Sequence, residues 1–174
     1  MKKKILIFAA ILLSASAIFI SCNKDKAAGS STLHVRLTDA PTAYQEVNVD
    51  IREVKVKFSD DTTNSGWVIL TTYPGIYNLL ALQNGVDTLL ATGVFPTQTV
   101  KEIRFILGPN NTIKDAGVVY PLTVPSGSES GLKLKINKSL NATLETLIID
   151  FDAALSVVKE GTGDYKLRPV LRVK

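Results

Sequence analysis

The sequence predicts an all-β protein: an antiparallel β-sandwich that follows an N-terminal signal peptide. Three observations favour this fold class. From Thr32 onward, apolar and polar residues alternate with a period of two, which is typical of half-buried strands. No long window of this region shows the helical period. Gly, Pro, Asn and Asp interrupt the alternation at short intervals, so we expect roughly eight or nine short strands in two packed sheets.

The strands at the start of this region have the clearest pattern. Residues 33–38 alternate apolar with polar side chains, and Asp39-Ala40-Pro41 ends that strand. Residues 47–58 form a second strand whose apolar positions change parity half-way along. One extra residue near Arg52–Glu53 would restore the phase, so we expect a β-bulge there.

The remaining strands are shorter and are separated by turn residues. The segment Ile76–Leu82 fits either a strand or a short helical turn. Pro121 lies on the face opposite the apolar side chains of its strand, which favours an edge strand. Between Lys101 and Leu107 the apolar side chains are expected to point inward and Arg104 outward. Further strands are expected over residues 67–73, 88–95, 101–107, 118–124, 132–136, 147–151 and 165–173.

The N-terminus has the layout of a secretory signal peptide. Three lysines follow Met1, and an apolar run from Ile5 to Ile20 ends at Ser21-Cys22. This ending resembles a bacterial lipobox, so we expect Cys22 to be the lipidated first residue of the mature protein. More than one acyl chain on that cysteine would make the anchoring stable. The predicted organisation is a signal peptide over 1–21, a polar flexible tether over 22–31 and a single β-sandwich domain over 32–174.

Charge and cysteine content narrow the classes of function. The formal net charge is +4, but three of the 20 basic residues precede Cys22 and no acidic residue does. The mature part therefore carries 17 basic and 16 acidic residues, which does not indicate a nucleic-acid partner. The single cysteine excludes an intramolecular disulfide. We expect a lipid-anchored protein of the cell envelope, in the outer membrane, with its periplasmic or surface-exposed orientation left open.

Several short blocks, taken in order, resemble one family of bacterial envelope lipoproteins, the domain of unknown function 4382 family. The resemblance covers nearly all of residues 32–174. It implies a prealbumin-like or carboxypeptidase-regulatory-like β-sandwich, and it implies no activity. The blocks are Leu37–Pro41, Tyr77–Leu82, Ile103–Phe105, Val124–Gly127 with Ser130–Lys133, Ile149–Ala153 with Ser156–Val157, and Tyr165–Val170.

Two carboxylates on one strand are the first candidate for chemistry. Asp150 and Asp152 share a strand face, where alternate residues lie about 6.6–7 Å apart. With Asp39 as a third oxygen donor they could contribute to a calcium site, because Ca²⁺ takes six to eight oxygen ligands. The alternative is structural: the aspartates pair with basic residues on neighbouring strands or cap loop amides. The basic residues considered are Arg104, Lys133 and Arg168.

Other polar and aromatic residues give weaker indications. His34 is the only histidine and lies on the polar face of its strand, which favours a solvated or hydrogen-bonding role. Ser126, Ser128 and Ser130 lack a base other than His34. An aromatic carbohydrate platform is conceivable from Trp67, Tyr73 and Tyr77, but their alternation favours core positions. No cofactor or metal site is predicted.

These features predict a non-enzymatic module that binds or scaffolds another envelope component, either a protein or a glycan. A fold by itself does not establish this function. The alternative is a cation-dependent binding protein or a hydrolytic enzyme that uses Asp39, Asp150 and Asp152. The two differ in whether the three carboxylates converge and respond to calcium.

Overall fold

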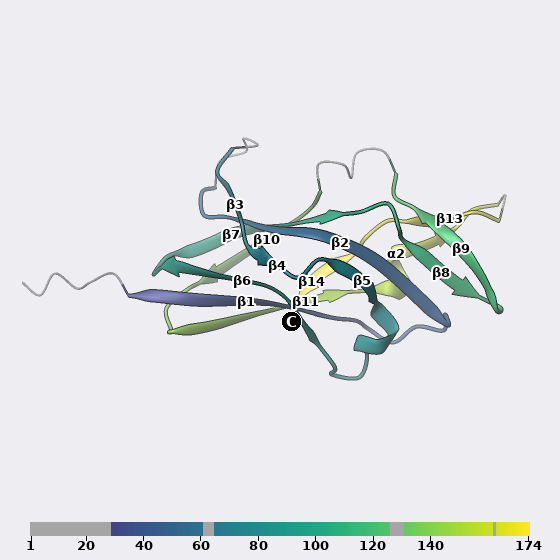
Figure 1. Ribbon diagram of the computed structural model, residues 1–174, viewed down its shortest axis with the longest axis horizontal. Coiled ribbons are helices and arrows are strands. Elements are labelled where there is room, and N and C mark those ends of the chain that lie inside the picture. Colours follow the sequence, from purple (N-terminus) through teal and green to yellow (C-terminus); the bar gives the residue numbers. More distant parts are fainter. Residues whose placement is uncertain (1–28, 61–64, 126–130, 162) are drawn as a thin grey trace, which may run out of the picture.

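The protein is an all-β sandwich of two sheets, as the sequence predicts. The computed structural model describes residues 29–60, 65–125, 131–161 and 163–174. The five-stranded sheet has the order β14 (Leu171–Val173), β11 (Leu144–Phe151), β1 (Ser30–Thr38), β6 (Thr88–Pro96) and β4 (Thr71–Thr72). Figure 1 shows β1 beginning at one end of the long axis, while the β8–β9 hairpin lies at the other end.

The second sheet is larger and has nine strands. Its order is β10 (Leu132–Ser139), β7 (Thr99–Leu107), β2 (Glu46–Lys57), β8 (Thr112–Asp115), β9 (Val118–Thr123), β13 (Tyr165–Leu167) and β12 (Val157–Lys159). Two short strands, β3 (Trp67–Ile69) and β5 (Gly75–Asn78), also pair with β2. Among the described strands only the β1–β11 and β9–β13 pairs are parallel. The described helices are the 3₁₀-helix η1 (Leu79–Leu82) and the one-turn helix α2 (Ala153–Ser156).

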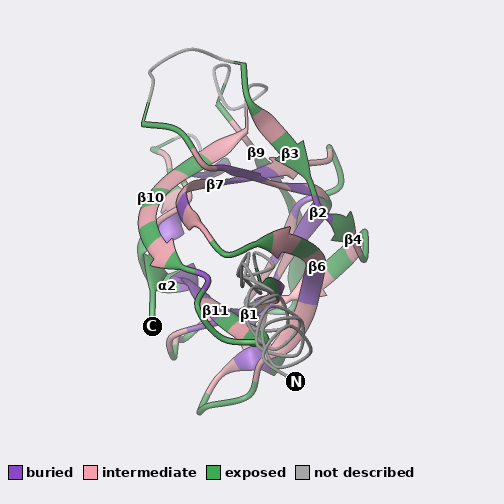
Figure 2. Ribbon diagram, turned by 90° about the vertical axis from the view of Figure 1, so that its left-hand side faces the viewer, coloured by how far each residue is buried: buried purple, intermediate pink, exposed green. Residues whose placement is uncertain are grey.

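One continuous core lies between the sheets (Figure 2). Strand β1 supplies Leu33, Val35 and Leu37, all fully buried. They lie in register with β11, which places Val35 beside Leu147. The alternation predicted for 33–38 and 147–151 is therefore the alternation of core and non-core side chains.

The predicted β-bulge is confirmed in β2. The register of β2 against β7 shifts between Ile51 and Glu53. Both Ile51 and Val54 are fully buried, although they have opposite parity in the sequence. The extra residue thus keeps both halves of this long strand facing the same core.

Two expected strands are each divided between the two sheets. The segment 67–73 forms β3 in the nine-stranded sheet and β4 in the five-stranded sheet, with buried Leu70 between them. The segment 165–173 likewise forms β13 and β14, separated by Arg168–Val170. A chain that crosses between packed sheets keeps its alternation, so the sequence pattern alone does not reveal the crossing.

Three further expectations are corrected by the structure. Strand β9 is not an edge strand: β8 pairs with one side, and β13 pairs with Leu122 and Thr123 on the other, beyond Pro121. Strand β8 was not expected at all. Arg104 does not point into solvent but is buried, with its guanidinium carbon 4.1 Å from the centre of the Trp67 ring. The segment 76–82 combines both expected forms, a strand followed by a 3₁₀ turn.

The turn after β7 packs against a buried carboxylate. Asp50 is fully buried and accepts hydrogen bonds from Arg52 Nη2 (2.7 Å) and Asn110 N (3.2 Å). A Cβ atom on Gly108 would lie far inside van der Waals contact with the Asp50 and Arg52 side chains. Glycine is therefore the residue that lets this turn close over the bulged strand.

We predict that Gly108→Ala lowers the free energy of unfolding by about 1–3 kcal/mol, because the added methyl group overlaps two side chains that hold the turn. Chemical denaturation of the purified protein measures the change. Gly161→Ala is the matched control, since a Cβ atom there meets no atom within 4 Å. Equal stability of both variants would contradict the role of Gly108.

Candidate functional site

The three aspartates singled out in the sequence lie around the start of α2. The parallel pairing of β1 with β11 sets Thr38 beside Asp150, so Asp39 follows directly at the same end of the sheet. All three residues are buried, with exposed fractions of 1%, 5% and 4% for Asp39, Asp150 and Asp152. Asp39 Oδ1 accepts a hydrogen bond from Ala153 N at 2.9 Å. Asp152 Oδ1 caps the helix by accepting from Leu155 N at 3.0 Å.

The basic partner of Asp150 and Asp152 is Arg172. Its Nη2 atom lies 3.6 Å from Asp150 Oδ2 and forms an ion pair with Asp152 Oδ2. This corrects the partners considered from the sequence: Arg104 and Lys133 belong to strands of the other sheet, and Arg168 precedes β14. Strand β14 pairs with β11 and sets Arg172 directly opposite Asp150.

Burial controls the ionisation of Asp39. Desolvation raises the pKa of its carboxyl group above the ordinary value, and the nearby charge of Asp150 acts in the same direction. Hydrogen bonds from Ala153 N and Gln83 Nε2 partly offset the increase in pKa. In the part of the chain that the structure describes, no group of three or more acidic, His or Cys side chains is arranged to hold a metal ion.

The acidic cluster fixes the path of the segment that follows β13. Asp152 N donates to Val170 O at 3.0 Å. Ser156, at the end of the same helix, accepts from Arg168 N at 2.7 Å through its carbonyl and from Val170 N at 2.9 Å through its hydroxyl. The backbone between Arg168 and Val170 is therefore held by α2, which the aspartates position.

This segment forms one wall of an open groove of about 640 Å³. The volume falls within the range of about 300–1,000 Å³ that is usual for ligand sites. Strand β10 forms the facing wall, and β10 contacts β14 directly. Most of the lining is apolar. The described lining residues are Val124, Pro125, Gly131, Leu132, Lys133, Leu134, Leu167, Arg168, Pro169, Val170 and Leu171.

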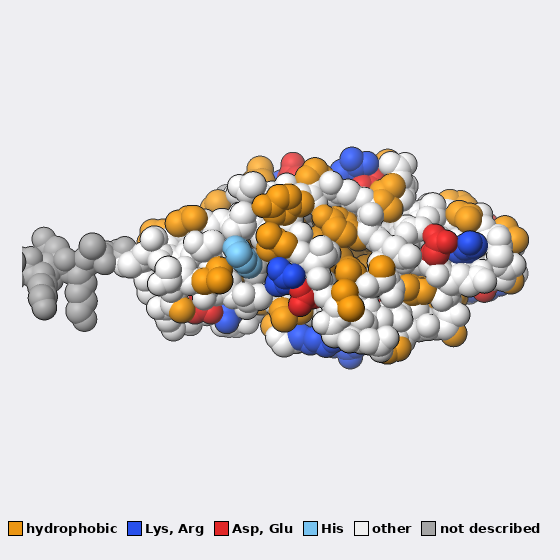
Figure 3. Space-filling model, turned by 60° about the horizontal axis from the view of Figure 1, so that its bottom comes forward, with side chains coloured by type: hydrophobic (Ala, Val, Ile, Leu, Met, Phe, Trp, Pro, Cys, Tyr) orange, Lys and Arg blue, Asp and Glu red, His pale blue; other side chains and the backbone are white. Residues whose placement is uncertain are grey.

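The groove has a cationic rim. Lys133 and Arg168 are the charged residues of its described lining, and both are exposed. Figure 3 shows one face of the molecule, on which hydrophobic, acidic and basic side chains are interspersed. The described lining of the groove thus combines an apolar floor with two cations.

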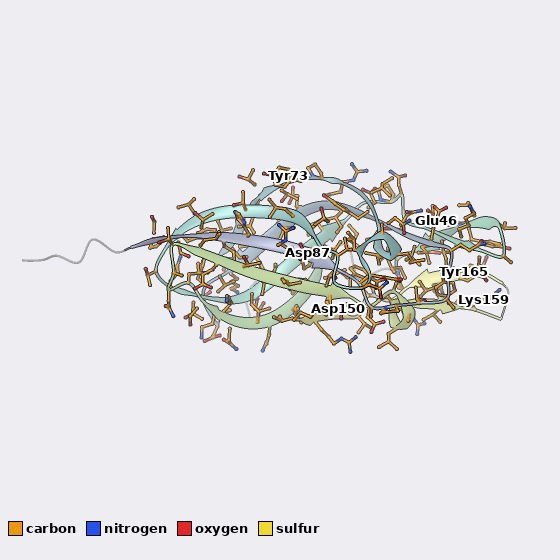
Figure 4. The ribbon with its side chains drawn as sticks, turned by 90° about the horizontal axis from the view of Figure 1, so that it is seen from below. Glu46, Tyr73, Asp87, Asp150, Lys159 and Tyr165 are labelled. Atoms are coloured by element: carbon orange, nitrogen blue, oxygen red, sulfur yellow. The ribbon has the colours of Figure 1, made fainter. Side chains whose placement is uncertain are left out.

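The remaining wall rests on an anchored strand. Leu167 belongs to β13, whose Tyr165 is buried and donates its hydroxyl hydrogen to Asp115 Oδ2 at 2.5 Å. The ammonium group of Lys159 lies 5.0 Å from the centre of the Tyr165 ring (Figure 4). The hydrogen bond to Asp115 raises the pKa of Tyr165, because the neighbouring carboxylate opposes loss of the phenol proton.

A second, smaller cavity of about 460 Å³ lies beside the Gly108–Asn111 turn.

The other sequence candidates that lie among the described residues do not assemble into a site. His34 is half-buried on β1. Trp67 stacks on Arg104, whereas Tyr73 is 48% exposed and its carbonyl accepts a hydrogen bond from the Tyr77 hydroxyl. Tyr73 is therefore not a core residue. Cys22 and the three serines, Ser126, Ser128 and Ser130, lie outside the described residues.

Sequence reasoning did not identify the groove. Lys133 and Arg168 were considered as ion-pair partners of the aspartates, not as the rim of a binding site. The signals that were present are the alternation of Leu and Lys over 132–135 and the Arg-Pro pair at 168–169 within the last predicted strand. Neither reveals that β10 and β14 face each other.

Comparison with known proteins identifies a family. A family model described as "Domain of unknown function (DUF4382)" matches residues 30–169. No curated protein and no solved structure matches the chain. The match covers both the acidic cluster around α2 and most of the groove.

We predict that Asp150→Asn lowers the free energy of unfolding by about 1–3 kcal/mol, because the change weakens the ion pair between a buried carboxylate and the half-exposed Arg172. The loss should be the same in EDTA and in millimolar Ca²⁺. Denaturation of wild type and variant in both buffers measures it. Asp60→Asn is the control, since its side chain is 76% exposed. A Ca²⁺-induced gain in stability of wild type that the variant lacks would contradict the structural role.

We also predict a distinct pH dependence for Asp39→Asn. The folded protein binds the Asp39 proton more tightly than the unfolded chain, because the folded-state pKa is raised above 3.8. Wild-type stability relative to the variant should therefore increase as pH falls through the folded pKa and level off below the ordinary value. Denaturation across this pH range measures the difference. A difference that does not change with pH would contradict the raised pKa.

Proposed function

The chain belongs to the DUF4382 family, and we propose that it is a lipid-anchored protein of the bacterial cell envelope whose sandwich binds another envelope component without catalysing a reaction. The partner of such a module is an envelope protein or a glycan. The observation that carries the proposal is the groove between β10 and β14.

The groove has the properties of a recognition site. Its apolar floor offers surface that a partner can bury, and its two rim cations orient a partner of opposite charge. One wall, residues 168–170, is held by hydrogen bonds to α2 and its cap residue Asp152, so little ordering of this wall is needed on binding. Blocks of the chain that carry the family resemblance, around 124–125, 131–133 and 165–170, meet at this groove.

The N-terminal sequence supports the anchor. The apolar run ends at Cys22, and the polar residues that follow lead to β1 at one end of the long axis (Figure 1). Attachment at that end would leave the sides of the sandwich available to a partner. Among the described residues, no helix has the length and apolar character needed to cross a bilayer.

The carboxylates favour this function over the cation-dependent alternative. Asp39 accepts from Ala153 N, Asp152 caps α2, and Arg172 faces both Asp150 and Asp152. A calcium ion would have to displace these protein contacts to gain its oxygen ligands.

We predict that Cys22→Ser leaves an unprocessed precursor or releases the protein from membranes, because the thiol is the site of acylation. Fractionation of cells, with mass spectrometry of the mature N-terminus, measures both outcomes. Ser14→Ala, a change within the apolar run, is the matched control and should be processed normally. An unmodified Cys22 in the wild-type protein, or cleavage at another residue, would contradict the anchor.

A further inference from the structure

The groove lies where the edges of both sheets meet. Strand β10 is the outermost strand of the nine-stranded sheet, and β14 is the outermost strand of the five-stranded sheet. On its inner side β10 pairs with β7 from Leu132 to Ser139. In the described part of the chain, no strand pairs with the outer side of β10. An unpaired edge presents a row of backbone donors and acceptors that another extended chain can satisfy.

The side chains of β10 alternate in a way that suits an added strand. Leu132 and Leu134 are half-buried and line the groove, whereas Lys133 and Lys135 are exposed. A strand laid beside this edge would also alternate, with one set of side chains over the apolar floor and the other set toward solvent. Partners with apolar residues at every second position therefore fit the floor.

The charge of the edge restricts the partner. A second copy of this chain paired through the same edge would set lysines against lysines, and like charges directly opposite each other are destabilising. An acidic partner would gain favourable pairs instead. The usable edge is short, because the register against β7 shifts between Lys135 and Lys138 and Asn137 has a positive φ of 51°. This irregularity limits regular pairing to the start of β10.

The opposite wall is prepared for such a partner. Arg168 is exposed at the groove, and its backbone N–H is fixed on Ser156 O at 2.7 Å. Its side chain therefore projects from a backbone that does not need to be ordered on binding. Arg168 and Lys133 give one cation on each side of the apolar floor.

We propose that the groove binds an extended, acidic segment of a partner protein by β-strand addition to β10. The segment's backbone pairs with the outer edge of Leu132–Lys135, its apolar side chains cover the groove floor, and its carboxylates reach Arg168. This inference rests on the proposed binding function and specifies the chemical class of the partner.

The test uses the full-length protein in detergent micelles and fluorescence anisotropy of labelled peptides. The probe is an alternating Glu–Val octapeptide, and a Lys–Val octapeptide is its matched control. We expect the Glu–Val peptide to bind at least about tenfold more tightly, because its carboxylates reach Arg168. A Glu–Val peptide that is N-methylated at every second residue should lose binding, since it cannot complete the ladder of hydrogen bonds.

Protein variants locate the binding. Arg168→Glu should lower the affinity for the Glu–Val peptide by at least about tenfold. Lys114→Glu makes the same change of charge on β8, far along the nine-stranded sheet from β10, and should leave binding unchanged. Circular dichroism of each variant reports whether the sandwich remains folded.

Four results would overturn the inference. Equal affinity for the Glu–Val and Lys–Val peptides would contradict an acidic partner. Unchanged binding of the N-methylated peptide would contradict strand addition. Binding of an alginate oligomer, an acidic glycan, in place of the peptide would also overturn it. If Arg168→Glu abolishes alginate binding, the groove still binds an envelope component and only the peptide inference fails. If neither probe binds, both the inference and the groove's role in the proposed function fail.

Discussion

The hydrogen bond from Ala153 N to the Asp39 carboxylate joins the end of strand β1 to the start of helix α2, and the rest of the structure depends on this contact. Asp39 ends the central strand of one sheet, and Ala153 begins the turn of helix through which the chain leaves that sheet for the other. The same helix carries Asp152, which caps it, and Ser156, which holds the backbone of Arg168 and Val170. The buried Asp39 carboxylate thus contacts α2, and α2 in turn holds the groove wall.

Burial of three carboxylates near one arginine has an energetic cost, and this cost explains the form of the network. Buried charges are stabilising only when hydrogen bonds and opposite charges replace the lost water. Here the replacements are backbone N–H groups, Gln83 and Arg172. Such a network contributes little net stability but restricts the local backbone to one path. A fixed path is useful beside a groove, because a partner then binds to walls that are already in place.

The sequence predicted features that depend on local periodicity and missed those that depend on sheet order. The bulge near Arg52–Glu53 was predictable because a change of parity is visible within one strand. The crossings at Leu70 and at Arg168–Val170 were not, because alternation continues through them. Arg104 follows the polar phase of its strand, yet Trp67 from another strand covers it. The groove depends on β10 and β14 being edge strands of different sheets, which no local pattern encodes.

The central claim is that the two edge strands bind a partner at the groove whose wall the aspartates hold. Hydrogen–deuterium exchange of the full-length protein, with and without saturating Glu–Val octapeptide, tests it most directly. The account predicts that added peptide slows amide exchange at the start of β10, around Leu132–Lys135, and leaves the amides of β8 unchanged. Slowed exchange confined to other strands, or no change in exchange at β10, would contradict it.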